Sequence, residues 1–231
     1  MKTIGLIGGM SWESTASYYS ALNEGIKNQL GGLHSAKIAL YSVDFAEIEE
    51  MQHKGEWDRT AHVLAGAAKA VEAGGADFFL ICTNTMHKVA PQVQEAVNIP
   101  LLHIADATAK QLQSDGIKTV GLLGTKFTME QDFYKSRLIE KFGIDVLIPN
   151  EEQRNVVHDV IYNKLCLGEI KESSRDKYLQ IIADLHVQGA QAVILGCTEI
   201  ALLVKPEHTE VPLYDTTAIH AQAAVEHAIS E

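Results

Sequence analysis

Clustered positive charge and paired cysteines are the first things this sequence lacks. Its 19 Lys and Arg residues are outnumbered by 30 Asp and Glu residues, which gives a net charge of −11, and the basic residues form no run. Nucleic acids and anionic membrane surfaces bind clustered positive charge, so the composition argues against both as partners. The 3 cysteines in 231 residues make no disulfide framework, and we expect them to be reduced thiols.

Long apolar runs and cofactor motifs are missing too. No apolar run approaches the roughly 20 residues of a membrane span, and residues 1–9 lack the apolar core and cleavage site of a signal peptide. We therefore expect a soluble, cytoplasmic protein. The histidines and cysteines show no metal-ligand spacing, and neither the dinucleotide nor the P-loop glycine pattern occurs. The sequence thus predicts no metal and no cofactor.

An internal repeat is what the sequence does contain. Residues 75–85 and 189–199 are both apolar runs that end in polar residues, and they align without gaps at an offset of 114. The alignment sets Thr83 against Cys197. These two stretches are the centre of the functional prediction.

Two further segments repeat at nearly the same offset. Residues 119–125 repeat residues 3–9 at an offset of 116, and residues 211–213 repeat residues 99–101 at an offset of 112. Three matched segments indicate two copies of one structural unit. The apolar runs predict strands, with helices between them, at residues 3–8, 36–43, 77–82, 99–104, 119–125, 144–148, 191–195 and 211–213.

Strands that alternate with helices predict an α/β fold. We expect two similar Rossmann-like three-layer αβα domains with parallel sheets, related by a pseudo-two-fold axis. Ligands bind beyond the carboxyl ends of such strands. Since both polar motifs follow strands, we expect an active site in the cleft between the two domains.

The paired motifs favour proton transfer. A thiol between a strand and a helix N-terminus is expected to have a lowered pKa, which suits Cys197 to this chemistry. The backbone N–H groups of Asn84-Thr85 and Thr198-Glu199 are suited to holding a carboxylate. Removing a proton from one face of a carbon and returning one to the other face inverts that carbon. The pattern therefore predicts racemisation.

Three motifs carry a resemblance to a known family. They are Gly8-Gly9-Met10-Ser11-Trp12-Glu13-Ser14-Thr15 with Tyr18-Tyr19, Thr83-Asn84-Thr85-Met86-His87, and Gly196-Cys197-Thr198-Glu199. With them the chain resembles the cofactor-independent aspartate/glutamate racemase superfamily, in its bacterial amino-acid racemase branch. The resemblance implies two α/β domains, 1–98 plus 209–231 and 99–208, with the last strand and helix returning to the first. It also implies a homodimer and an amino-acid substrate.

The resemblance assigns roles to individual residues. Cys197 is implied as one acid/base, and the position of Thr83 as the other. Substrate-binding residues are implied at Met10, Gln52, Asn84, Thr85, Lys164, Thr198 and Glu199.

Thr83 departs from the family pattern, which has a cysteine before Asn-Thr. A hydroxyl is a far weaker acid than a thiol and needs a neighbour if it is to act as a base. The departure leaves three interpretations: a lopsided two-base racemase, a register shift that lets Cys82 act, or a one-sided enzyme. Neighbouring strand residues point to opposite faces, and Cys82 aligns with Gly196, so we expect Cys82 to be a buried packing thiol and Thr83 to act.

The sequence leaves alternatives open for both the substrate and the reaction class. No Arg precedes Arg59, so an acidic side chain lacks a bidentate partner in that part of the chain, and either aspartate and glutamate or a broader range of amino acids fits. A single-cysteine decarboxylase of malonate-type substrates is the second hypothesis. A non-catalytic amino-acid-binding protein is the third.

Overall fold

The computed structural model describes residues 1–230 and divides the chain into two compact units. The first unit comprises Met1–Ile104 together with the chain from His220 onward, and the second comprises Ala105–Ile219. Each unit has one parallel β-sheet with helices packed against it. The predicted α/β class with two parallel sheets is therefore confirmed.

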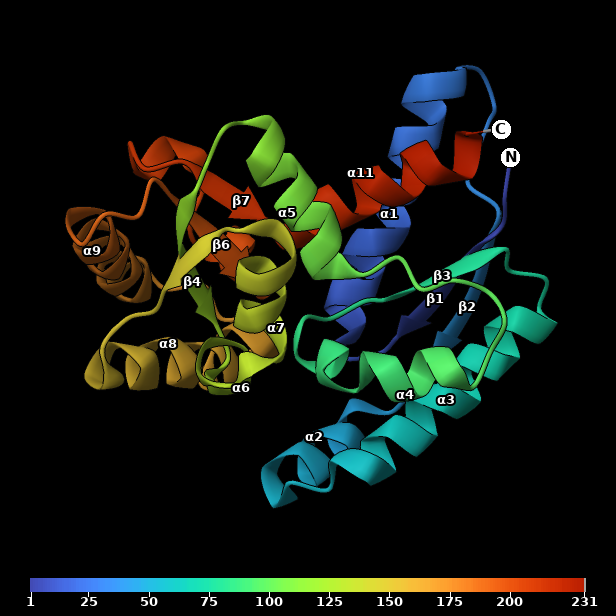
Figure 1. Cartoon of the computed structure of the whole chain (residues 1–231), viewed down its shortest axis with the longest axis horizontal. Helices are drawn as coiled ribbons and strands as arrows, with labels where there is room; N and C mark the ends of the chain where they lie inside the picture. Colours follow the sequence, from blue (N-terminus) through green and yellow to red (C-terminus); the bar gives the residue numbers. More distant parts are fainter. Residues whose placement is uncertain (231) are drawn as a thin grey trace. The chain divides into compact units, whose positions relative to one another are not determined.

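The first unit has a three-stranded sheet. Its order is β2-β1-β3, with β1 at Ile4–Gly8, β2 at Ile38–Ser42 and β3 at Phe78–Ile81 (Figure 1). The helices of this unit are α1 (Trp12–Leu30), α2 (Phe45–Lys54), α3 (Trp57–Ala73), the 3-10 helix η1 (Thr85–Val89), α4 (Ala90–Glu95) and the part of α11 (Thr216–Ile229) that follows Ile219.

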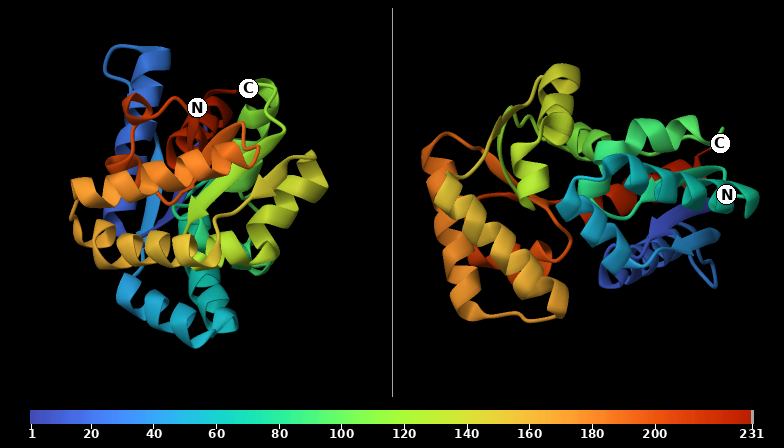
Figure 2. Two further views of the ribbon diagram at one scale, coloured as in Figure 1. Left: turned by 90° about the vertical axis from the view of Figure 1, so that its left-hand side faces the viewer. Right: turned by 90° about the horizontal axis from the view of Figure 1, so that it is seen from below.

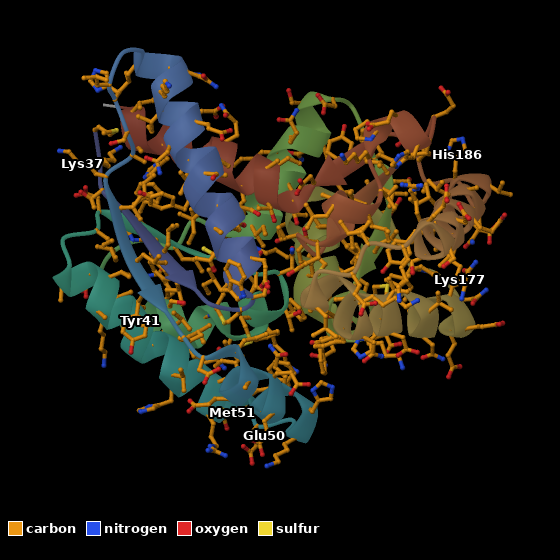
Figure 3. All side chains as sticks on the ribbon, turned by 180° about the vertical axis from the view of Figure 1, so that it is seen from behind. Lys37, Tyr41, Glu50, Met51, Lys177 and His186 are labelled. Atoms are coloured by element: carbon orange, nitrogen blue, oxygen red, sulfur yellow. The ribbon has the colours of Figure 1, made fainter. Side chains whose placement is uncertain are left out.

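Alternating strand residues build the two cores of the first unit. Ile4 and Leu6 on β1 pack against α1 and α11, in a cluster that includes Tyr18. Ile7 on the same strand points the other way and packs with Leu64 of α3. The edge strand β2 is more open, and its Tyr41 is 46% exposed (Figure 3).

The second unit has a four-stranded sheet. Its order is β5-β4-β6-β7, with β4 at Thr119–Gly124, β5 at Asp145–Leu147, β6 at Ala192–Gly196 and β7 at Leu213–Asp215. The helices are α5 (Ile104–Ser114, which begins in the first unit), α6 (Lys126–Glu130), α7 (Asp132–Ser136), the π-helix η2 (Arg137–Lys141), α8 (Glu151–Asn163), η3 (Leu165–Leu167), α9 (Glu172–Val187), α10 (Ile200–Leu203) and η4 (Pro206–His208). In both views of Figure 2, α8 and α9 lie side by side. Together they cover Leu123, Val193 and Leu195 of the sheet.

The register of the two sheets confirms the internal repeat. Residues that the repeat aligns occupy equivalent places in the two strand ladders. The equivalent pairs are Gly5–Phe79 and Phe79–Leu101 in the first unit, and Gly121–Val193 and Val193–Leu213 in the second.

Two details of the sequence prediction are wrong. The stretch 99–104 forms only one bridge, between Leu101 and Phe79, and α5 begins at Ile104. The last strand does not return to the first sheet, because β7 pairs with β6 in the second. The repeat explains the second point: Leu213 is the counterpart of Leu101, so each sheet retains its own final strand. The units thus divide after Ile104 and Ile219, not at the predicted 98/99 and 208/209.

Residues 1–230 include no helix long and apolar enough to cross a membrane.

The turn after β1 depends on Gly9. Its φ is +92°, and a Cβ atom there would lie 2.2 Å from the carbonyl oxygen of Val43. We expect Gly9→Ala to lower the free energy of unfolding by roughly 3 kcal/mol, because backbone strain and overlap with fixed backbone add. Gly55→Ala is the matched control: Gly55 also has positive φ, +70°, but has nothing within 4 Å of the added atom. It should lose only about 1 kcal/mol in urea titrations. Equal losses in the two variants would contradict the steric part of this account.

Candidate active site

In the first unit, Thr83, Asn84 and Thr85 follow the carboxyl end of β3. Thr83 is half-buried, whereas Asn84 and Thr85 are 3% and 5% exposed. Thr85 is the first residue of η1, so Asn84 and Thr85 have the predicted positions at a helix start. Thr83 is therefore the most accessible of these three residues.

Cys82 lies in the core beside this motif. It is fully buried among Ile4, Leu6 and Tyr18, and burial raises the pKa of its thiol far above the usual range. Its carbonyl oxygen accepts a hydrogen bond from Ser14 Oγ at 3.4 Å. The prediction of a buried packing thiol at Cys82 is confirmed.

Met10 and Gln52 are both associated with the core cluster of this unit that contains Met86. Met10 is 4% exposed and belongs to the core cluster that contains Ile48 and Met86. Gln52, on α2, is 3% exposed, and its Nε2 donates to Met86 Sδ at 3.0 Å. The structure thus bonds Gln52 to Met86 of η1 and places Met10 in the core cluster that includes Met86.

In the second unit, Cys197 directly follows β6. Its Sγ donates to Glu199 Oε2 at 2.9 Å, and Glu199 is 5% exposed. Burial, the Glu199 carboxylate and Cys166 hold the pKa of Cys197 well above its usual range.

The predicted lowering of the Cys197 pKa is therefore wrong. The prediction relied on the dipole of the following helix, but α10 has only 4 residues. The dipole of so short a helix is small. Burial of the thiol and the nearly buried Glu199 carboxylate in hydrogen-bond contact outweigh it, since both disfavour the thiolate.

The sequence did not identify the partner of Thr198. Thr198 Oγ1 lies 2.7 Å from Thr217 Oγ1, at the start of α11. Asp215 holds that start in place, because its Oδ1 accepts from the N–H groups of Thr217 and Ala218 at 2.9 and 3.2 Å. An Asp followed by two Thr residues after a strand is an N-cap signature that would have pointed to Thr217.

Lys164 lies in the corner between α8, η3 and α9. It is half-buried, and its Nζ donates to Ser174 Oγ at 3.2 Å. Two residues further on, Cys166 packs against the same hydrophobic cluster as Cys197. The segment therefore reaches the Cys197 region, while the Lys164 ammonium is bonded within its own corner.

The contact between Cys197 and Glu199 makes a prediction about thiol reactivity. Glu199→Gln removes the negative charge, so the pKa of Cys197 should fall. We expect alkylation of Cys197 by iodoacetamide at pH 8 to become about tenfold faster, as a shift of one pKa unit would produce. Peptide mass spectrometry separates Cys197 from the other two thiols. Glu207→Gln, at an exposed carboxylate of the same unit, is the control. A rate unchanged by Glu199→Gln would contradict the contact.

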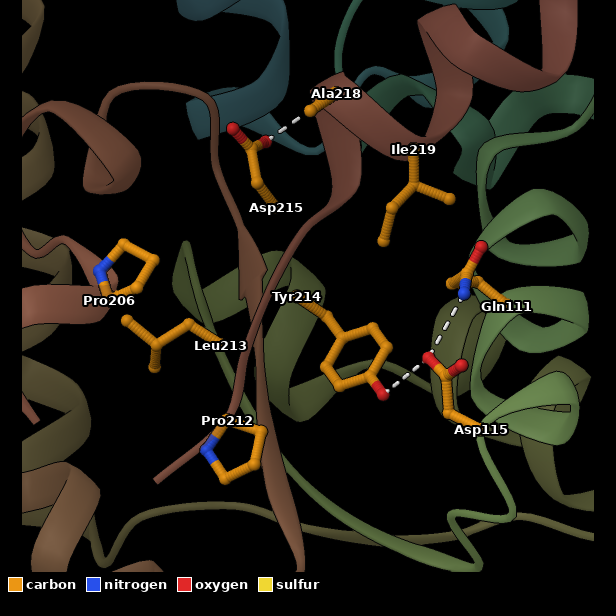
Figure 4. A pocket seen from close by; sticks show the side chains of 9 residues that line it. All are labelled: Gln111, Asp115, Pro206, Pro212, Leu213, Tyr214, Asp215, Ala218 and Ile219. Carbon is orange, nitrogen blue, oxygen red and sulfur yellow. Dashed lines mark hydrogen bonds between the residues drawn. The ribbon is translucent and has the colours of Figure 1, made fainter. Parts of the chain in front are cut away.

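A cavity of about 500 Å³ lies elsewhere in the second unit, against β7 (Figure 4). Leu213 and Pro212 line it, and Tyr214 Oη donates to Asp115 at 2.8 Å beside Gln111. None of the predicted site residues lines this cavity. Among residues 1–230, no group of three or more His, Cys, Asp or Glu side chains is arranged to hold a metal ion.

Comparison with known proteins places both motifs inside one family model. The model described as Asp/Glu/Hydantoin racemase matches residues 7–224. The chain is also 24% identical over 236 residues to the broad specificity amino-acid racemase RacX of Bacillus subtilis, with 96% of each chain covered.

Solved structures agree over the whole chain. A crystal structure of a candidate Asp/Glu racemase from Yersinia pestis is 56% identical, with a TM-score of 0.94 and 100% of both chains covered. An aspartate racemase homologue from Pyrococcus horikoshii is 34% identical, with a TM-score of 0.85 and 100% of both chains covered.

Proposed function

The chain belongs to the Asp/Glu/Hydantoin racemase family and is an isomerase, and we propose that it interconverts L- and D-amino acids by proton transfer at Cα without a cofactor. The observation that carries the proposal is the Cys197 thiol, which lies at a strand end in hydrogen-bond contact with Glu199. The repeat makes Thr83 the counterpart of Cys197. The proposal requires these two side chains to act on opposite faces of one Cα atom.

The chemistry needs one proton acceptor and one proton donor. Cys197 starts as a thiol and passes its proton to Glu199, and the thiolate then takes the proton from Cα. The hydroxyl of Thr83 gives its proton to the opposite face, because a carbanion is far more basic than an alkoxide. The alkoxide of Thr83 regains a proton from water, and Glu199 gives its proton to the hydroxide that this leaves, which restores all three side chains before the next turnover. In the reverse direction Thr83 must act as a base, which is the harder task for a hydroxyl.

The substrate carboxylate would be held by backbone amides. In the proposal, the N–H groups at Asn84-Thr85 and Thr198-Glu199 bind it, because both stretches follow the carboxyl ends of parallel strands, where ligands bind in α/β sheets. Met10, Gln52 and Lys164 are proposed to contact the rest of the substrate. The relatives are named for Asp/Glu and for broad specificity, so we propose acidic amino acids first and a broader range second.

A panel of L- and D-amino acids in D2O, read by proton NMR, tests the proposal. Racemisation predicts deuterium at Cα together with the opposite enantiomer, with no cofactor added. Chiral chromatography gives the inversion rate and NMR gives the exchange rate. Purified protein that neither inverts nor exchanges any common amino acid would refute the proposed function.

A decarboxylase is the second candidate. It is favoured by the burial of Cys82, which leaves the β3 motif without an accessible thiol. Such an enzyme would release CO2 from a substituted malonate and protonate one face from Cys197. Measured CO2 release from methylphenylmalonate, without exchange of amino acids, would favour it over racemisation.

We also propose a homodimer. Trp12 and Tyr19, seven residues apart on α1, are 68% and 53% exposed, and large aromatic side chains at the surface are typical of protein contacts. Sedimentation equilibrium of the full chain at micromolar concentration tests this state, and a single monomeric species would contradict it.

A further inference from the structure

Three histidines and a tyrosine form a buried cluster behind the Thr83 motif. His87, His103 and His220 are 2%, 7% and 0% exposed. The His87 ring centroid lies 4.5 Å from that of His103 and 6.0 Å from that of His220. Tyr18 Oη lies 2.8 Å from His220 Nδ1. The catalytic proposal above uses none of these four side chains.

The hydrogen bonds of His87 assign its protonation. The N–H of Ile104 donates to His87 Nε2 at 3.3 Å, so Nε2 carries a lone pair. The proton of a neutral ring is then on Nδ1, which donates to the carbonyl oxygen of Thr83 at 2.8 Å. His87 therefore joins the end of β3 to the start of α5.

His220 supports this arrangement from behind. Its Nε2 donates to the carbonyl oxygen of Leu102 at 2.7 Å, and its Nδ1 accepts from the Tyr18 hydroxyl. Burial lowers the pKa of His220 to about 4, so its ring is neutral at physiological pH. The cluster thus fixes the chain at Leu102–Ile104, to which His87 is bonded.

The bond from His87 to Thr83 orients more than one atom. A trans peptide group is planar, so the carbonyl of Thr83 and the N–H of Asn84 point in opposite directions. The Asn84 N–H must therefore point away from the imidazole that holds the carbonyl. That N–H is one of the donors that we propose to bind the substrate carboxylate. The side chain of Thr83 is attached to the Cα atom next to the same carbonyl group, so the bond from His87 also orients that side chain.

We propose that His87 is a positioning residue for the reaction: its Nδ1–H fixes the peptide plane that aims both the Asn84 N–H and the Thr83 side chain. The proposal deepens the proposed function and rests on it. His87 touches no reacting atom. Its loss should misplace the Thr83 side of the site and leave the Cys197 side as it was.

The test compares two substitutions at one position. His87→Asn places an amide N–H close to the place of Nδ1 and should keep kcat/KM for inversion within about threefold of the wild type. His87→Leu has no donor, and we expect kcat/KM to fall roughly 10- to 100-fold, as misplacement by about 1 Å produces. KM should rise in the leucine variant, because the amide that holds the carboxylate is no longer aimed. Deuterium exchange of the enantiomer that Cys197 deprotonates should persist.

Four readouts test positioning against general packing. Tyr18→Phe removes only the hydroxyl that His220 contacts, and His220 keeps its bond to Leu102, so inversion should stay within about threefold of the wild type. Equal losses in His87→Asn and His87→Leu would overturn the proposal, as would inversion and exchange that fall together.

15N NMR of the wild-type imidazoles should show His87 protonated at Nδ1, and a proton at Nε2 would also overturn the proposal. Because the NMR tautomer does not depend on activity, an inactive wild type would refute the proposed function without deciding the tautomer.

Discussion

Cys197→Ala should abolish inversion of every amino acid that the wild type racemises, with a loss of kcat/KM of roughly 10³-fold to 10⁴-fold. The reason is that the thiol is the group at the focus of the second motif that can both take and give a proton. Glu199 accepts the hydrogen bond from this thiol at 2.9 Å, so the proton has a carboxylate to move to. Chiral chromatography of the product measures the loss.

Two cysteine variants are matched controls for this prediction. Cys197→Ser keeps the size of the side chain but replaces the thiol with a much weaker acid, so it should stay at least about 100-fold below the wild type. Cys166→Ala removes a thiol that packs against the same hydrophobic cluster and should keep nearly full activity. Thermal melting of all three variants shows whether the fold is retained.

The outcomes of the cysteine series are distinct. Inversion that survives in Cys197→Ala would show that another group exchanges the proton. Inversion that is lost equally in Cys166→Ala and Cys197→Ala would indicate damage to the shared core instead of loss of an acid/base. A Cys197→Ser variant as active as the wild type would refute the need for a thiol.

The sequence was sufficient to predict the repeated framework, since it depends on apolar periodicity. Gly5 and Gly121, or Phe79 and Val193, occupy equivalent ladder positions because buried strands must alternate in the same way in both copies. The same alternation predicted that Cys82 points into the core while Thr83 does not. Both predictions depend only on the direction in which successive strand residues point. The local sequence determines that direction without contacts to distant residues.

What the sequence could not predict depends on side-chain geometry. The helix after Cys197 favours a low thiol pKa, and burial of the thiol together with the position of the Glu199 carboxylate reverses that expectation. The bond between Thr198 and Thr217 joins residues 19 positions apart, and nothing local to Thr198 announces it. The bond from His220 to Leu102 spans 118 positions. Such contacts depend on how the chain packs in three dimensions, not on the spacing of residues in the sequence.

Thr83→Ala should remove inversion while leaving proton exchange at Cα for one enantiomer only. Without the hydroxyl, no group protonates the second face, and we expect kcat/KM for inversion to fall roughly 10²-fold to 10³-fold. The two enantiomers have equal free energy, so kcat/KM must fall by the same factor in both directions. Cys197 can still remove and return a proton on its own face. That enantiomer should gain deuterium in D2O and keep its configuration, whereas the other should gain none.

Thr83→Ser is the matched control, because it keeps the hydroxyl and removes only a methyl group. It should retain inversion within about tenfold of the wild type, the reduction reflecting the freer rotation of serine about χ1. Proton NMR in D2O and chiral chromatography on the same samples give exchange and inversion together.

Inversion at the wild-type rate in Thr83→Ala would show that Thr83 is not the second acid/base. Exchange of both enantiomers in that variant would show that a further group serves the face assigned to Thr83. Exchange confined to one enantiomer, together with lost inversion, is the result that only a two-sided site with a missing partner produces.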